Sequence, residues 1–284
     1  MKVYDCFMYF DEDTIVDLRF NCLNNYVDKF VIVESKFTHS GKKRDLLFDI
    51  NKFKQFKDKI NYLVLDHEPH GIETVYDNEN DAIQSGKYIL NAAKRENYQR
   101  NYISKGIKNV EPEDIILMSD ADEIPNLENI NLKKIKNKLI FFKQKMFYYK
   151  LNLCLNSFNW FGTKACRKKD LISPQWLRNI KDRNYPWWRL DSYFSNLKYS
   201  NIKFIDNGGW HFSYLKTPEE IDKKLKSYLH HREYELNPLG VDKIKNLIEQ
   251  KKTVYNLNTD QRVNQFSSGN KLNKIDINLL PKYI

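Results

Sequence analysis

The chain of 284 residues has few of the residues that mark specialised protein classes. Its four cysteines, Cys6, Cys22, Cys154 and Cys166, show no CxxC spacing and no nearby histidine. We therefore expect neither a zinc site nor a redox pair, but small core thiols of a reducing compartment, with two disulfides as the alternative. Nine glycines and eight prolines are too few for a collagen-like or low-complexity protein.

Long apolar runs are also missing. No stretch approaches the roughly 18 apolar residues of a membrane-spanning helix. The N-terminal apolar stretch is followed at once by Asp11, Glu12 and Asp13, which interrupts any signal-peptide core. We therefore expect a soluble, cytoplasmic protein with no transmembrane segment.

The composition indicates a globular protein with an anionic partner. Hydrophobic residues make up 41% of the chain and aromatic residues 14%, which is enough for a substantial core. Lys and Arg number 47 against 37 Asp and Glu, a net charge of +10. This charge fits a nucleic acid, a phosphorylated small molecule or an anionic surface, including peripheral contact with a membrane.

The first part of the chain alternates strand and helix patterns. Short apolar runs predict strands at 3–10, 30–33, 62–65 and 115–118, and helical patterns lie between them, the longest at 79–106. This alternation predicts an α/β domain with a mostly parallel sheet.

The second part of the chain has a different character. Residues 139–155 are rich in Phe and Tyr with strand periodicity, and all five tryptophans lie between residues 159 and 214. Thr217, Pro218 and Glu220 predict a helix start with a capping box. We expect one domain over 1–235, with a nucleotide-binding half at 1–125 and an acceptor half at 126–235. Residues 236–284 would form a helical or irregular extension packed on it.

An acidic turn is the main candidate for chemistry. Asp120 and Asp122 directly follow the predicted buried strand at 115–118. In open α/β sheets, ligands bind beyond the carboxyl ends of the strands. Two carboxylates at i and i+2 can converge on Mg²⁺ or Mn²⁺, which prefer oxygen ligands. The alternative is a solvated acidic turn or a helix cap.

Four segments together resemble one enzyme family. The motif residues are Val3-Tyr4-Asp5-Cys6-Phe7 with Glu12 and Leu18-Arg19-Phe20; Glu34-Ser35-Lys36-Phe37-Thr38 with Gly41 and Arg44; Ser119 to Pro125; and Gly209-Trp210-His211-Phe212-Ser213. In this order they resemble glycosyltransferase family 17 over roughly residues 3 to 235. The resemblance implies a GT-A fold, a Rossmann-type mixed sheet flanked by helices with an aromatic-rich acceptor side. It also implies a UDP-sugar donor, UDP-GlcNAc in the typical case.

The resemblance extends the predicted metal site. Asp120 and Asp122 would hold Mn²⁺ or Mg²⁺, and His211, from a distant segment, is the candidate third ligand. A purely structural role for His211 is the alternative. The ion would neutralise the diphosphate that departs from the donor.

Further residues are candidates for donor binding. Glu34 and Ser35 end the second predicted strand, so they belong to the same sheet edge as Asp120, which is itself a donor-binding candidate. Thr38 lies in the same resembling segment. Arg44 could contact phosphate or lie in a solvated basic turn. Arg100 could contact the diphosphate or form only a surface ion pair with Glu96 at i,i+4.

An inverting transfer needs a carboxylate that accepts the proton of the acceptor hydroxyl. Glu123 and Asp191 are the two candidates for this base. Trp187, Trp188 and Trp210 are candidates for stacking on acceptor sugars, with burial in the core as the alternative.

The sequence thus predicts a metal-dependent inverting glycosyltransferase that moves a sugar, GlcNAc by resemblance, to a glycan or glycoconjugate acceptor. The main alternative is a basic nucleic-acid-binding protein or a nuclease that uses Asp120, Asp122 and Glu123. Lysines spread along the chain and the absence of a nucleic-acid-binding signature disfavour it. A non-catalytic sugar-binding protein is the third possibility.

Overall fold

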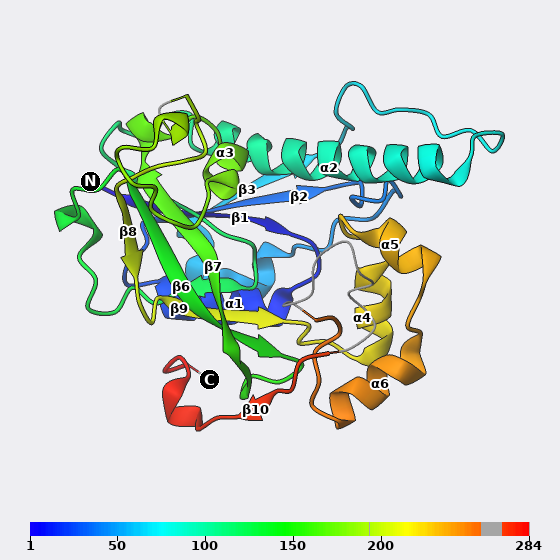
Figure 1. Cartoon of the computed structure of the whole chain (residues 1–284). Coiled ribbons are helices and arrows are strands. Elements are labelled where there is room, and N and C mark those ends of the chain that lie inside the picture. Colours follow the sequence, from blue (N-terminus) through cyan, green and yellow to red (C-terminus); the bar gives the residue numbers. More distant parts are fainter. Residues whose placement is uncertain (193, 257–268, 284) are drawn as a thin grey trace.

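The computed structural model of the protein describes residues 1–192, 194–256 and 269–283. One mixed sheet runs through the molecule, with helices on both faces (Figure 1). Its first half is parallel and has the order β3 (Ile60–Leu65), β2 (Lys29–Ser35), β1 (Val3–Tyr9) and β4 (Ile115–Met118). The predicted parallel α/β half is confirmed. Phe30, Val31, Ile32 and Val33 are fully buried, because helices cover both faces of β2.

The second half of the sheet mixes strand directions. It continues with β7 (Leu153–Arg167), β6 (Leu139–Tyr148), β9 (Gly209–Ser213) and β5 (Glu123–Pro125). β7 is antiparallel to β4 and β6, β9 is parallel to β6, and β5 is antiparallel to β9. β8 (Ile202–Ile205) pairs with β6, and β10 (Asn273–Lys274) pairs with β7. The sheet as a whole is therefore mixed, consistent with a GT-A-like fold.

Helices form a layer on each face of the sheet. α1 (Asp13–Leu23) and the 3₁₀ segment η1 (Ile50–Lys59) pack on one face through an apolar cluster that contains Phe20, Phe53 and Phe56. The long α2 (Asp81–Gly106) and the short α3 (Pro174–Asn179) cover the other face, where Ile103 and Trp176 are buried. Short 3₁₀ turns complete the described elements: η2 (Leu132–Lys134), η3 (Lys168–Asp170), η4 (Leu190–Ser192) and η5 (Ile277–Leu279).

A third apolar cluster joins the C-terminal helices to the ends of β6 and β7. It includes residues of α4 (Pro218–Leu225), α5 (His231–Leu236) and α6 (Val241–Glu249), together with Val254 and Leu272. The predicted capping box is confirmed: the Glu220 amide donates to the Thr217 hydroxyl, and the Thr217 amide donates to the Glu220 carboxylate. The weakly periodic stretch beyond Asn256 falls largely on residues 257–268, outside the described residues. Among the described helices, none combines the length and apolar character needed to cross a bilayer.

One glycine fixes the pairing of β5 with β9. Gly209 has φ +131°, and a Cβ atom there would lie 2.1 Å from the Ile124 carbonyl oxygen. We expect Gly209→Ala to lower the free energy of unfolding by about 1–3 kcal/mol, because backbone atoms would have to move. Gly86→Ala, on exposed helix with open space around it, should instead raise it by about 0.5–1 kcal/mol. Urea denaturation followed by circular dichroism measures both, and equal effects would contradict the strain at Gly209.

Candidate active site

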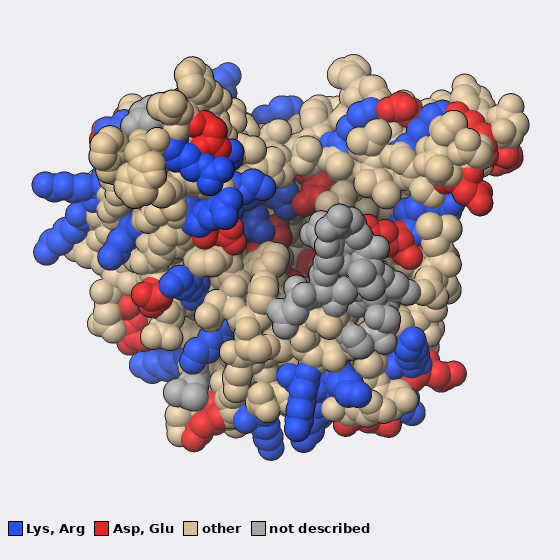
Figure 2. Space-filling view, viewed as in Figure 1, with Lys and Arg blue, Asp and Glu red and all other residues tan. Residues whose placement is uncertain are grey.

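A cavity of about 420 Å³ lies where the carboxyl ends of β1, β2 and β4 meet β9 and α4. In Figure 2, acidic side chains lie in the hollow at the centre of the molecule, with Lys and Arg side chains to its left. The cavity is lined by Met8, Tyr9, Phe10, Glu12, Phe37, Thr38, His39, Arg44, Glu96, Gln99, Arg100, Asp120, Ala121, Asp122, Trp160, His211, Ser213, Tyr214, Lys224, Ser227, Tyr228, Leu229, His230 and Tyr255.

Arg19 fixes the acidic turn between β4 and β5 through hydrogen bonds to its backbone. This α1 residue is fully buried and makes two 2.6 Å bonds to the Asp5 carboxylate of β1. Its remaining nitrogen, Nη1, donates to the carbonyl oxygens of Asp120, Ala121 and Glu123. A charge-assisted network of this kind fixes a backbone turn, so the Asp120 and Asp122 side chains project from a rigid support.

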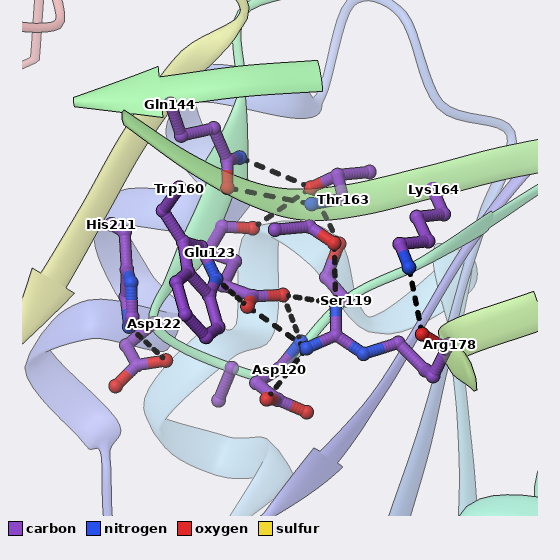
Figure 3. A network of polar contacts seen from close by, with 12 residues as sticks. Ser119, Asp120, Asp122, Glu123, Gln144, Trp160, Thr163, Lys164, Arg178 and His211 are labelled. Atoms are coloured by element: carbon purple, nitrogen blue, oxygen red, sulfur yellow. Dashed lines mark hydrogen bonds and ion pairs between the residues drawn. The ribbon is translucent and has the colours of Figure 1, made fainter. Parts of the chain in front are cut away.

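The pairing of β5 with β9 brings His211 to the same turn. Glu123 is opposite His211 in the register, and the Phe212 amide donates to the Asp122 carbonyl oxygen at 2.9 Å. His211 Nε2 lies 3.5 Å from Asp122 Oδ1 (Figure 3). Lys224 Nζ of α4 lies 3.7 Å from Asp122 Oδ2. Burial opposes ionisation of Asp122, but His211 and Lys224 outweigh it and lower the pKa of this carboxyl. Burial alone would lower the pKa of His211, but Asp122, Glu123 and Asp120 together outweigh it, so this pKa is raised.

Asp120 points toward two arginines. Its Oδ1 accepts from Arg100 Nη2 of α2, and its Oδ2 accepts from Arg178 Nη2 of α3, both at 3.0 Å. Burial acts against the charged form, yet Arg178 and Arg100 together hold the pKa of Asp120 well below its usual range. Asp120 is therefore an ionised carboxylate between two guanidinium groups, at the wall of the cavity.

Glu123 has a different environment from its neighbours. Its side chain is fully buried and accepts hydrogen bonds from Trp160 Nε1 at 2.5 Å, from the Asp120 amide at 2.8 Å and from both terminal nitrogens of Arg178 (Figure 3). Four donors occupy its two oxygens, and it does not line the cavity. The structure places the Glu123 carboxylate as an internal counterion of Arg178, and its role as general base stays a prediction that this placement does not favour.

Arg178 is in turn positioned by Lys164. The Lys164 ammonium donates to the carbonyl oxygens of Arg178 and Ile180, at 2.7 and 2.6 Å, where α3 ends. Burial, followed by the charge of Arg178, lowers the pKa of Lys164 to about 7. The end of α3 is thus tied to β7 by a buried amine, which fixes the direction of the Arg178 side chain.

The predicted metal ligands are not gathered as one set of three. Among residues 1–192, 194–256 and 269–283, no group of three His, Cys, Asp or Glu side chains is placed to share an ion. Asp122 and His211 face each other, whereas Asp120 is turned to its arginines. The His211 Nδ1 atom is buried and has no hydrogen-bond partner in the described parts of the chain. The Asp122 carboxylate suits Mn²⁺ or Mg²⁺, and the His211 imidazole adds a nitrogen ligand that fits Mn²⁺ better than the harder Mg²⁺, so this pair fits an ion that takes its other ligands from substrate and water.

The predicted donor-binding residues divide into two groups. Thr38, Arg44 and Arg100 line the cavity. Glu34 and Ser35 do not line it, and their bonds favour a structural role over the predicted contact with the donor. The Glu34 carboxylate is fully buried, accepts from the amides of Leu47 and Phe48 and from Tyr62 Oη, and forms an ion pair with Arg44, so it holds the loop after β2. The Ser35 hydroxyl accepts from the Phe37 amide in the same loop.

Arg100 is not the surface residue of the alternative interpretation. It is 3% exposed and bonds both Glu96 and Asp120. The predicted i,i+4 pair exists, but it lies at the cavity wall.

The other predicted base and the acceptor tryptophans lie away from the cavity. Asp191 is exposed and paired with Arg189 and Lys198. Trp187 and Trp188 are 72% and 67% exposed, so they neither fill the core nor line the site. Trp210 packs partly buried against the core on the α1 face of the sheet. The tryptophan at the cavity is Trp160, whose ring lies 5.3 Å from that of His211.

Several site residues were missed by the sequence interpretation. Two cations contact the acidic turn, Arg178 at Asp120 and Lys224 at Asp122. The aromatic side chains that line the cavity beside them are Trp160, Tyr214, Tyr228 and Tyr255. Their local sequences have no distinctive spacing. Lys224 had one usable signal, since it lies on a correctly predicted helix just after the His211 segment.

Comparisons with known proteins agree with this arrangement. Residues 1–265 match the sequence profile described as Glycosyltransferase family 17. Beta-1,4-mannosyl-glycoprotein 4-beta-N-acetylglucosaminyltransferase from Homo sapiens is 26% identical over 234 residues, which cover 76% of this chain and 41% of the relative. The Rattus norvegicus protein of the same name is also 26% identical over 234 residues and 76% of this chain, with 40% of the relative covered. The chain thus spans about two fifths of these relatives.

Among solved structures, the inositol-1-phosphate CTP transferase from T. maritima is similar with a TM-score of 0.34 and 14% identity. The similarity covers 86% of this chain and 96% of that one, and it is too weak to bear on fold or function. The profile match is the decisive comparison because it extends over nearly the whole sequence, including all four motif segments and the complete acidic turn. The chain belongs to glycosyltransferase family 17.

Proposed function

We propose that the protein is a metal-dependent, inverting glycosyltransferase that moves GlcNAc from UDP-GlcNAc to a hydroxyl of a glycan acceptor. The observation that carries the proposal is the Asp122–His211 pair at the edge of a cavity beyond the carboxyl ends of β1, β2 and β4. The names of the family 17 relatives support the choice of GlcNAc.

Asp122 and His211 are the residues that would hold Mn²⁺ or Mg²⁺. When bound there, the ion supplies positive charge that neutralises the diphosphate of the donor. Divalent ions of this kind bind through one or two protein side chains together with substrate phosphates. Two protein ligands therefore suffice, and Asp120 remains available for the donor.

The chain's own cations would stabilise the departing diphosphate. Arg100 and Lys224 enter the cavity from α2 and α4, on either side of the acidic turn. Negative charge develops on the leaving group as the glycosidic bond breaks, and fixed cations in a site partly shielded from water lower the barrier. Trp160, Tyr214 and Tyr228 offer aromatic faces to sugar rings and exclude water beside them.

The general base must lie within hydrogen-bond reach of the acceptor hydroxyl. Carboxylates that line the cavity are the candidates for this role, and neither Glu123 nor Asp191 lines it. These carboxylates are Glu12, Glu96, Asp120 and Asp122. The nuclease alternative required Asp120, Asp122 and Glu123 to share metal ions, and the burial of Glu123 against Arg178 disfavours it.

Thermal unfolding with and without ligand tests the proposal. UDP-GlcNAc with Mn²⁺ should raise the melting temperature by several degrees, since a ligand at about 100 times its Kd stabilises the native state by about 2.7 kcal/mol. UDP-GlcNAc with EDTA and GDP-mannose with Mn²⁺ are the controls, and both should give smaller shifts. Equal stabilisation with EDTA would refute the metal requirement, and no stabilisation by any UDP-sugar would refute the donor class.

A further inference from the structure

The most exposed apolar side chains of the described protein gather on one loop outside the cavity. Trp187, Trp188, Leu190 and Phe194 are 72%, 67%, 75% and 91% exposed. We call these four side chains the aromatic patch. They follow α3, at the end of the molecule opposite α4, α5 and α6 (Figure 1). Exposed apolar side chains in such a group mark an interaction surface rather than chance exposure.

The loop that carries the aromatic patch is folded at its base. The Lys181 amide donates to the Leu197 carbonyl oxygen and the Tyr185 amide to that of Tyr199, both at 2.9 Å. Tyr185 is only 3% exposed and anchors the loop, while the rings of Trp187 and Trp188 meet edge-on with centroids 5.9 Å apart. The patch is thus presented outward by hydrogen-bonded backbone.

Cations surround the base of the aromatic patch. Arg183, Arg189 and Lys198 each approach the ring of Tyr185, with distances of 4.7, 5.4 and 5.7 Å to its centroid. Asp191 pairs with Arg189 and Lys198. Arg183 has no acidic partner among the described residues. The whole chain adds a net charge of +10, and Figure 2 shows many Lys and Arg side chains on this side of the molecule.

We propose that the aromatic patch docks the protein on the surface of an anionic lipid bilayer. Tryptophan prefers the boundary between headgroups and acyl chains, where an apolar ring with a polar N–H fits both environments. Leucine and phenylalanine beside it bury further apolar area, and neighbouring Arg and Lys are attracted to anionic headgroups. The aromatic patch would enter the acyl-chain boundary while the cations at its base contact the headgroups. A bilayer is favoured over a nucleic acid, because a nucleic acid would leave Leu190 and Phe194 in water.

The aromatic patch is connected to the candidate site through α3. The loop continues directly from α3, whose Arg178 bonds Asp120 and Glu123. The surface attachment and the cavity therefore share one short helix. The inference does not depend on the proposed reaction, because it concerns residues outside the cavity.

Vesicle flotation of the full chain tests the inference. Vesicles of phosphatidylcholine alone and of phosphatidylcholine mixed equally with phosphatidylglycerol are compared at low and high salt. We expect the protein to float with the anionic vesicles, and less so at high salt. Trp187→Ser combined with Trp188→Ser should weaken binding roughly tenfold or more. Arg183→Gln combined with Arg189→Gln should remove the preference for anionic vesicles.

Matched controls come from apolar side chains exposed elsewhere. Tyr76→Ser and Leu236→Ser change side chains that are 57% and 62% exposed, and both variants should float like the unmodified protein. The inference is overturned if the unmodified protein does not bind anionic vesicles, or if the double tryptophan variant binds equally well. It is also overturned if gel filtration shows a dimer that the tryptophan substitutions dissociate, since the patch would then join two copies of the chain.

Discussion

Asp122→Asn is expected to lower kcat for transfer from UDP-GlcNAc by about a hundredfold to a thousandfold, the size of effect seen when one preorganised electrostatic group is removed from an active site. The amide keeps the shape of the side chain but removes its negative charge. His211 and Lys224 then lose the carboxylate that both of them face, and the pair proposed to hold the metal loses its anionic member. Steady-state kinetics over a range of Mn²⁺ concentrations measures the change.

The matched control for this variant is Asp206→Asn. Asp206 is 76% exposed and pairs with Lys143 outside the cavity, so its kcat should equal that of the unmodified protein. Melting curves confirm that both variants are folded. If Asp122→Asn retained full kcat at every Mn²⁺ concentration while folded, the assignment of Asp122 to the metal would be wrong.

Arg178→Met is expected to lower the free energy of unfolding by about 3–5 kcal/mol, because it leaves a buried charge without its counterion. Glu123 has no exposed surface, and Arg178 supplies two of its four hydrogen bonds. Asp120 would also lose one of its two arginine partners. Urea denaturation followed by tryptophan fluorescence gives the free energy of unfolding.

A double-mutant cycle separates this effect from lost packing. Glu123→Gln in the Arg178→Met background should recover part of the stability, because the neutral amide costs less to bury than an unpaired carboxylate. Arg189→Met removes an exposed partner of Asp191 and should leave the free energy of unfolding nearly unchanged. Strictly additive effects of the Glu123 and Arg178 substitutions would contradict a direct coupling between the two side chains.

The parts of the fold that the sequence predicted are those with strong local patterns. The short uninterrupted apolar runs of β2 and β4 are typical of buried strands, and Thr217 with Glu220 forms a cap from residues three apart. The acidic turn was identified because it directly follows β4. Each of these features is encoded within a few neighbouring residues.

The parts that could not be predicted depend on contacts between distant segments. Arg178 reaches Asp120 across 58 positions, and nothing in the α3 sequence indicates that partner. Glu123 and Asp122 are adjacent, yet the Glu123 side chain is enclosed by Trp160 and Arg178 while Asp122 lines the cavity, since Asp122 belongs to the turn and Glu123 is the first residue of β5. Trp187 and Trp188 could equally be core, sugar-binding or surface residues until their exposure is known.

The contribution of Tyr255 to the cavity wall has a consequence for synthesis of the protein. Its segment is attached late in the chain, where the Tyr149 hydroxyl donates to the Lys252 carbonyl oxygen and Val254 is buried in the third apolar cluster. During translation, the acidic turn at residues 119–123 is synthesised long before the segment that supplies Tyr255. The cavity can therefore be completed only after the segment around residue 255 has been translated.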